Sequence, residues 1–132
     1  MALSDKYPYK NHNFGQSLHH ALRGLGAIVK RERNFRFDLI ATLVVAGLGW
    51  WLQVSRSTWL WLIAASGLVL IAEAFNSAIE ALMRWQVGDR FDPDPRISRV
   101  LDMAAGAVLV AALIAALIGV IALWPYLVEA LT

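Results

Sequence analysis

Three polar side chains follow a long apolar segment of this 132-residue chain. Glu73, Asn76 and Glu80 come directly after the uncharged run 57–72 and are spaced three and four residues apart. In an α-helix this spacing places all three side chains on one face, over roughly 10 Å of helix length. Carboxylate and amide oxygens suit a hard divalent cation such as Mg²⁺, which often bridges carboxylates to substrate phosphates. The spacing therefore predicts a metal-assisted phosphate site.

Two further acids are expected to join this face. Glu32 precedes the first apolar run and Asp102 opens the third, so both fall at the same end of the apolar segments as Glu73 and Glu80. Taken singly, Glu32 can be a solvated charge and Asp102 a charge favoured at a helix N-terminus. The carboxylates can also form an interhelical hydrogen-bond cluster, or a relay that conducts protons or cations. Their convergence favours a functional site, because an ionisable group in a membrane is costly and functional by default.

The elements that carry these residues are predicted to cross a membrane. Hydrophobic residues make up 58% of the chain, and charged residues are absent from the runs 39–55, 57–72 and 103–128. A bilayer core needs roughly 20 helical residues. We therefore predict an all-α integral membrane protein with three transmembrane helices, at about 37–54, 57–83 and 99–128. A soluble protein with three buried helices is disfavoured, because it would have little polar surface.

The segment before the first span is predicted to hold a surface helix. Residues 1–13 form a polar lead that we expect to be disordered, and 14–132 is expected to be a single membrane domain. Within 16–30, Leu18, Leu22 and Leu25 recur at helical spacing, which is typical of an amphipathic helix in the membrane interface. Helix caps are expected at Ser57 or Thr58 for the second span, and at Ser98 for the third.

Basic residues are distributed unevenly. Eleven of the twelve Lys and Arg residues precede the first span or lie between the second and third, and only Arg56 lies elsewhere. Positive charge stays on the cytoplasmic side, so the N-terminus is predicted to be cytoplasmic and the C-terminus outside. Anionic headgroups or a nucleotide polyphosphate are the expected partners of this charge, and nucleic acid is not. The absence of cysteine excludes thiolate metal sites and cysteine nucleophiles.

Four segments, in this order along the chain, carry a family resemblance: SLHHALRGL (17–25), ERNFRFD (32–38), EAFNSAIE (73–80) and DMAAGAVL (102–109). They resemble the small prokaryotic diacylglycerol kinase family, which includes undecaprenol kinases. The resemblance implies a surface helix and three transmembrane helices, assembled as a homotrimer in the bacterial inner membrane, with active sites shared between subunits near the cytoplasmic side. It also implies that ATP phosphorylates the hydroxyl of a membrane lipid alcohol, either diacylglycerol or undecaprenol.

The resemblance also implies a role for individual residues. Glu73 matches the general base that accepts the proton of the lipid hydroxyl. Glu32 and Glu80 match the carboxylates that bind the Mg²⁺ of MgATP. The remaining matches support the site or its nucleotide: Asn76, Asp102 and Arg23.

Two positions depart from the family pattern. Leu101 stands where the family usually has a lysine that contacts ATP phosphates, and Arg84 stands where it usually has an aspartate. One interpretation is that Arg84, Arg96 or Arg99 supplies the missing cation from a new place. The other is a catalytically weakened relative that binds nucleotide or lipid in the membrane.

Overall fold

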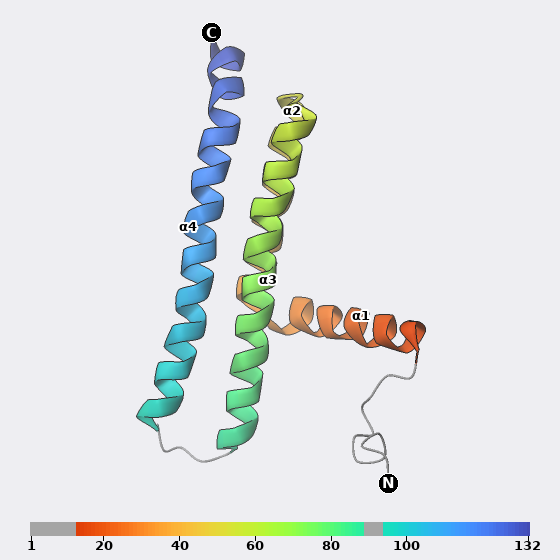
Figure 1. Cartoon of the computed structure of the whole chain (residues 1–132), viewed down its shortest axis with the longest axis vertical. Helices are drawn as coiled ribbons and strands as arrows, with labels where there is room; N and C mark the ends of the chain where they lie inside the picture. The colour runs from red at the N-terminus through yellow and green to blue at the C-terminus, as the bar shows by residue number, and fades with distance from the viewer. Residues whose placement is uncertain (1–12, 89–93) are drawn as a thin grey trace. The chain divides into compact units, whose positions relative to one another are not determined.

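The computed structural model describes residues 13–88 and 94–132, and all of their regular structure is helical (Figure 1). The helices are α1 (Phe14–Arg31), α2 (Arg33–Trp51), α3 (Arg56–Val87) and α4 (Pro95–Leu131). The all-α prediction is thereby confirmed. Residues 1–12, which make up most of the predicted disordered lead, lie outside the described residues.

The chain divides into two compact units, Met1–Arg31 and Glu32–Thr132. The helix of the first unit, α1, begins after Asn13, whose side-chain oxygen accepts a hydrogen bond from the backbone N–H of Gln16 at 2.9 Å. This contact caps the helix by pairing one of its free N–H groups. The predicted N-terminal helix is thus confirmed, and Leu18 and Leu22 on it are exposed. Its position on a membrane surface remains a prediction.

The second unit consists of three helices, and α3 contacts both of the others. α2 and α3 form a hairpin through the short turn 52–55, in which Gln53 has a positive φ of 50°. α3 and α4 lie side by side and run in opposite directions, as Figure 1 shows. Through these contacts α3 brings residues from the start of α2 near residues at its own end.

α3 begins earlier than the sequence predicted. Ser55, in extended conformation, is the N-cap, and its Oγ accepts a hydrogen bond from the backbone N–H of Thr58 at 3.2 Å. The expected caps at Ser57 and Thr58 are therefore wrong, because both residues already lie in the first turn. The helix ends at Val87 and is followed by the C-cap Gly88, whose φ of 57° suits a residue without a side chain. It runs for 32 residues and includes the whole predicted polar face.

α4 also begins before its predicted cap. The side chain of Asp94 accepts a hydrogen bond from the backbone N–H of Arg96 at 2.8 Å, and Pro95 occupies the first helical position. Proline is favoured there because its φ is preset and its missing N–H would have no helical partner. Ser98, the predicted cap, lies inside this helix. α4 extends over 37 residues, beyond both ends of the predicted span.

The apolar core of the second unit lies near the 52–55 turn. Val54, Leu62 and Leu123 are buried there and form one cluster. Gly49 lets α2 approach α3 closely, because a Cβ at this position would lie only 3.0 Å from the ring of Trp59. We call this region, the turn with its core and neighbouring side chains, the turn end.

Among the described residues, α3 and α4 are long and apolar enough to cross a membrane. Both also expose many large apolar side chains, as expected for helices that face lipid or other subunits. α2 is not apolar enough to count as a membrane-spanning helix in the same way. It has 19 residues, and the charged Arg36 and Asp38 lie in its first two turns. Two of the three predicted spans are thus supported, and the first remains a prediction.

Candidate active site

The second half of α3 buries polar side chains. Glu73, Asn76 and Ser77 are only 3%, 6% and 4% exposed, and they are the buried polar residues among those that the structure describes. All three lie on one helix, in a segment that the sequence predicts to span the membrane. Burial of an ionisable group costs free energy unless partners compensate for it. The neighbours of these side chains therefore decide what the site can do.

Asn76 links the buried residues to Glu80. Its side-chain amide donates a hydrogen bond to Oε1 of Glu80 at 2.9 Å, which confirms that these two residues share a face. Asn76 Oδ1 and Ser77 Oγ are buried and have no hydrogen-bond partner among the described residues. A buried polar atom without a partner costs about 1–3 kcal/mol. These two atoms are therefore free to accept a hydrogen bond or a ligand.

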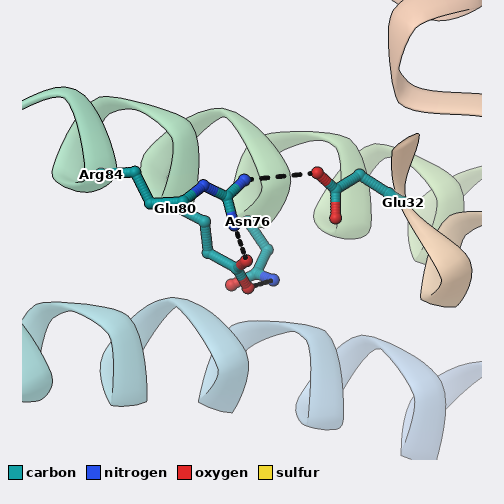
Figure 2. A network of polar contacts seen from close by, with 4 residues as sticks. All are labelled: Glu32, Asn76, Glu80 and Arg84. Atoms are coloured by element: carbon teal, nitrogen blue, oxygen red, sulfur yellow. Dashed lines mark hydrogen bonds and ion pairs between the residues drawn. The ribbon is translucent and has the colours of Figure 1, made fainter. Parts of the chain in front are cut away.

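Arg84 joins the two carboxylates that the resemblance assigns to metal binding. Its Nη1 lies 3.4 Å from Oε2 of Glu80, one turn earlier on α3, and its Nη2 lies 3.4 Å from Oε1 of Glu32, at the N-cap of α2 (Figure 2). Glu32 is thus brought to the polar face of α3, as the sequence predicted. We call the group of Glu32, Glu73, Asn76, Glu80 and Arg84 the polar end.

α2 contributes two residues that were not among the predicted site residues. The side chain of Asn34 forms a hydrogen bond with the Glu73 carboxylate, and Asp38 lies close enough to Glu73 for their negative charges to repel each other. Asn34 and Asp38 are four residues apart, so they share one face of α2. This spacing, inside the segment 32–38, shows a shared helix face but not which helix that face contacts.

Two predicted site residues lie outside this group. Asp102 is exposed on α4, whereas the preceding Leu101 lines a pocket of about 390 Å³ together with Glu80 and Arg84. Arg23 belongs to α1, in the other unit of the chain. The structure thus brings together Glu32, Asn76 and Glu80 next to the buried Glu73, whereas Asp102 makes none of the side-chain contacts described for this network.

The residues of the polar end fit a divalent cation that is shared with phosphate. Glu32 and Glu80 offer carboxylate oxygens to one cationic group, the guanidinium of Arg84, which stands in for a positive ion. No group of three or more His, Asp or Glu side chains that could hold a metal occurs within 13–88 and 94–132. Mg²⁺ commonly takes one or two carboxylates and completes its shell with water and substrate phosphates. Two carboxylates are therefore a sufficient protein contribution.

Two apolar helices of membrane-spanning length, one of them with a buried carboxylate and amide face, are consistent with a helical membrane protein that has a polar site. The sequence profile of the family Prokaryotic diacylglycerol kinase matches residues 19–123. The chain therefore belongs to the prokaryotic diacylglycerol kinase family, a family of bacterial lipid kinases, and the resemblance of its motifs is confirmed.

Individual relatives carry two different substrate names. A diacylglycerol kinase of Escherichia coli (strain K12) is 35% identical over 104 residues, which cover 79% of this chain and 83% of the relative. An undecaprenol kinase of Bacillus subtilis (strain 168) is 32% identical over 114 residues, covering 86% and 90%. A diacylglycerol kinase of Synechocystis sp. is 33% identical over 116 residues, covering 86% and 63%. This chain is similar to proteins of both names to nearly the same degree.

Proposed function

We propose that this protein is an ATP-dependent lipid kinase that phosphorylates the hydroxyl of a membrane lipid alcohol, diacylglycerol or undecaprenol. The observation that carries the proposal is the buried Glu73 beside the carboxylates of Glu32 and Glu80, in a chain of this family. A carboxylate in an apolar segment has one evident use in such a reaction, which is to accept the proton of an uncharged alcohol.

In the proposed reaction the hydroxyl oxygen of the lipid attacks the γ-phosphorus of ATP. A new P–O bond forms to the lipid, the bond between the γ-phosphorus and the β–γ bridging oxygen breaks, and ADP leaves with that oxygen. Glu73 accepts the hydroxyl proton. Asn34 and Asn76 orient the acidic face around it, because each has an amide directed at a carboxylate of the site. Phosphoryl transfer depends mainly on such positioning and on charge stabilisation.

The remaining residues are proposed to hold the nucleotide. Glu32 and Glu80 would hold Mg²⁺, which neutralises phosphate oxygens when it is bound. Asp102 and Arg23 would support the nucleotide from α4 and α1. For Asp102, the support for this role is its position near the start of α4, one residue after Leu101, which lines the pocket next to Glu80.

The assembly that we propose is a homotrimer in the bacterial inner membrane. In it α2, α3 and α4 all span the bilayer, the N-terminus is cytoplasmic and the C-terminus lies outside. The many apolar side chains that α3 and α4 expose support this arrangement, because one chain cannot cover them itself. The uneven distribution of Lys and Arg supports the orientation.

A lipid-alcohol panel with labelled ATP tests the proposal. The purified protein, reconstituted in lipid with Mg²⁺, is given diacylglycerol or undecaprenol, and labelled phospholipid is counted. We expect the label in at least one of the two lipids, and about 10²–10⁴-fold slower labelling when Glu73→Gln replaces the wild type. A folded oligomer that labels neither lipid would refute the proposal.

The position of Arg84 favours a second candidate function. Its contacts with Glu32 and Glu80 neutralise part of the charge that a metal ion would need. A protein of this kind would bind nucleotide or lipid and turn over slowly or not at all. The double variant Arg84→Asp, Leu101→Lys distinguishes this function from an active kinase. A large gain in turnover supports the second function. A loss of turnover supports an active site in which Arg84 takes part.

A further inference from the structure

The guanidinium of Arg84 occupies the space between two carboxylates of different helices. Each of its terminal nitrogens serves a different carboxylate: Nη1 faces Glu80 and Nη2 faces Glu32, both at 3.4 Å (Figure 2). The carboxylates of Glu32 and Glu80 together carry two negative charges, and Arg84 neutralises one of them. The bridged group therefore keeps a negative charge. Glu73, which lies close enough to interact with the charges of both Glu32 and Glu80, adds to it when it is ionised.

The contacts of Arg84 are weak enough to be exchanged. Ion pairs with strong charge-assisted hydrogen bonds have N–O distances of about 2.7–2.9 Å, and both distances here are longer. The Arg84 side chain is also 62% exposed, whereas those of Glu32 and Glu80 are 24% and 35% exposed. Exposed pairs of this kind contribute little stability, because water and salt compete with them.

Arg96, another cation of the second unit, pairs with an acid outside the polar end. Arg96 lies 3.4 Å from Asp94 at the start of α4, and its side chain is 90% exposed. Arg84 is also the cation that lines the pocket of about 390 Å³ beside Glu80, together with Gly88, Ile97 and Leu101. This pocket offers the guanidinium a place to move without leaving the site.

We propose that Arg84 is a tethered competitor of the divalent cation at Glu32 and Glu80. It bridges the two carboxylates while no metal is bound, and it leaves both when a metal ion takes them. The inference rests on the proposed function, because it assumes that these carboxylates hold the metal. It adds a regulatory element of this chain: metal binding has to displace an internal positive charge.

A consequence concerns the nucleotide. A released guanidinium in the pocket next to Glu80 is well suited to phosphate, which arginine recognises through paired N–H donors. The metal ion would bind the two carboxylates of these ion pairs, and the phosphates would bind the guanidinium. Each ligand would therefore free a group that the other needs, so the two would favour each other's binding. Metal alone is accordingly expected to bind weakly.

The test measures Mn²⁺ binding without nucleotide, by the EPR signal of free Mn²⁺, on full-length protein reconstituted in lipid. For Arg84→Gln we expect about tenfold tighter binding than for the wild type, equivalent to about 1.4 kcal/mol. Arg84→Met, which removes the charge but keeps an unbranched side chain, should behave in the same way and guards against a folding defect in one variant. Arg96→Gln is the matched control, and its affinity should equal that of the wild type.

Affinity that is unchanged or weaker in both Arg84 variants would overturn the inference. The tighter binding must also disappear when Glu80→Gln is added to Arg84→Gln, and its persistence would show that the metal lies elsewhere. Lipid phosphorylation by the wild type is measured on the same samples. Turnover without a change in Mn²⁺ affinity refutes the inference alone, whereas tightened Mn²⁺ binding without any turnover refutes the proposed kinase activity and leaves the inference standing.

Discussion

At the turn end, the hydroxyl of Tyr126 accepts a hydrogen bond from the backbone N–H of Ser55 at 3.2 Å and lies 3.1 Å from the hydroxyl of Thr58. These groups are uncharged and satisfy one another beside the apolar core of Leu62 and Leu123. At the polar end of the same helix, α3, carboxylates gather around a buried Glu73, and Asn76 Oδ1 has no partner among the described residues.

The difference between the two ends indicates which of them stabilises the fold. Apolar burial and paired neutral hydrogen bonds stabilise a fold. Gathered carboxylates and unpaired buried oxygens destabilise it, and such features persist where a site needs them. We infer that the turn end holds the hairpin and α4 together, and that the polar end is kept for the proposed phosphoryl transfer. The experiments below separate the two roles.

The largest effect is expected from Glu73→Gln at the polar end. Loss of a general base lowers turnover by about 10²–10⁴-fold, while the neutral amide keeps the size of the side chain. MgATP binding should survive, which titration calorimetry checks beside the turnover assay. Glu129→Gln, the same change at an exposed position of α4 near the turn end, is the control and should keep wild-type turnover. Turnover of Glu73→Gln within threefold of the wild type would contradict a catalytic role.

Leu123→Ala should produce the next largest effect, and on stability. Leu123 is buried at 7% exposure in the turn-end core, and loss of such a side chain lowers the free energy of unfolding by about 2–5 kcal/mol. Turnover per folded molecule should change less than twofold. Equilibrium unfolding in mixed micelles measures the change, with Leu131→Ala, which is 83% exposed, as the control. A selective loss of turnover would remove the distinction between the two ends.

The sequence predicted the polar end better than the turn end, and the reason is physical. Glu73, Asn76 and Glu80 stand out because helical spacing alone puts them on one face of an apolar segment. The cap at Ser55 depends on the backbone conformation of the 52–55 turn, and its contact with Tyr126 joins residues 71 positions apart. Neither follows from local spacing.

The partner of Arg84 was not predictable either. The sequence marks Arg84 as a departure and leaves Arg96 and Arg99 as equal candidates for the missing cation. Only the packing of α2 against α3 places Glu32 within 3.4 Å of Arg84. Asn34 and Asp38 were missed for the same reason, because an i, i+4 pair shows a shared helix face but not the helix that it meets.

Glu80→Gln tests whether Glu73 and Glu80, both at the polar end, have different roles. A lost carboxylate should raise the Mg²⁺ concentration for half-maximal turnover by about tenfold or more, since even residues that only support a metal ligand cost 10–100-fold in affinity. Glu73→Gln should leave that Mg²⁺ concentration unchanged. Assays of residual turnover over a range of Mg²⁺ concentrations distinguish the two. Equal shifts in both variants would show that Glu73 and Glu80 do not have separate roles.

Tyr126→Phe is expected to have the smallest effect. It removes the hydroxyl that contacts Ser55 and Thr58, and the loss of hydrogen bonds of this kind costs about 0.5–1.5 kcal/mol each. The free energy of unfolding should fall by that order while turnover stays the same. A loss of turnover larger than the loss of stability would place a functional role at the turn end.

The central claim is that the turn end stabilises the fold and the polar end is kept for chemistry. The most direct test is the free energy of unfolding of Glu73→Gln, measured in lipid–detergent mixtures beside the wild type. A side chain kept for chemistry at the expense of stability can be replaced without weakening the fold. We expect the inactive variant to be as stable as the wild type or more stable. A variant that loses stability and turnover together would contradict the account, because Glu73 would then be part of what holds the helices in place.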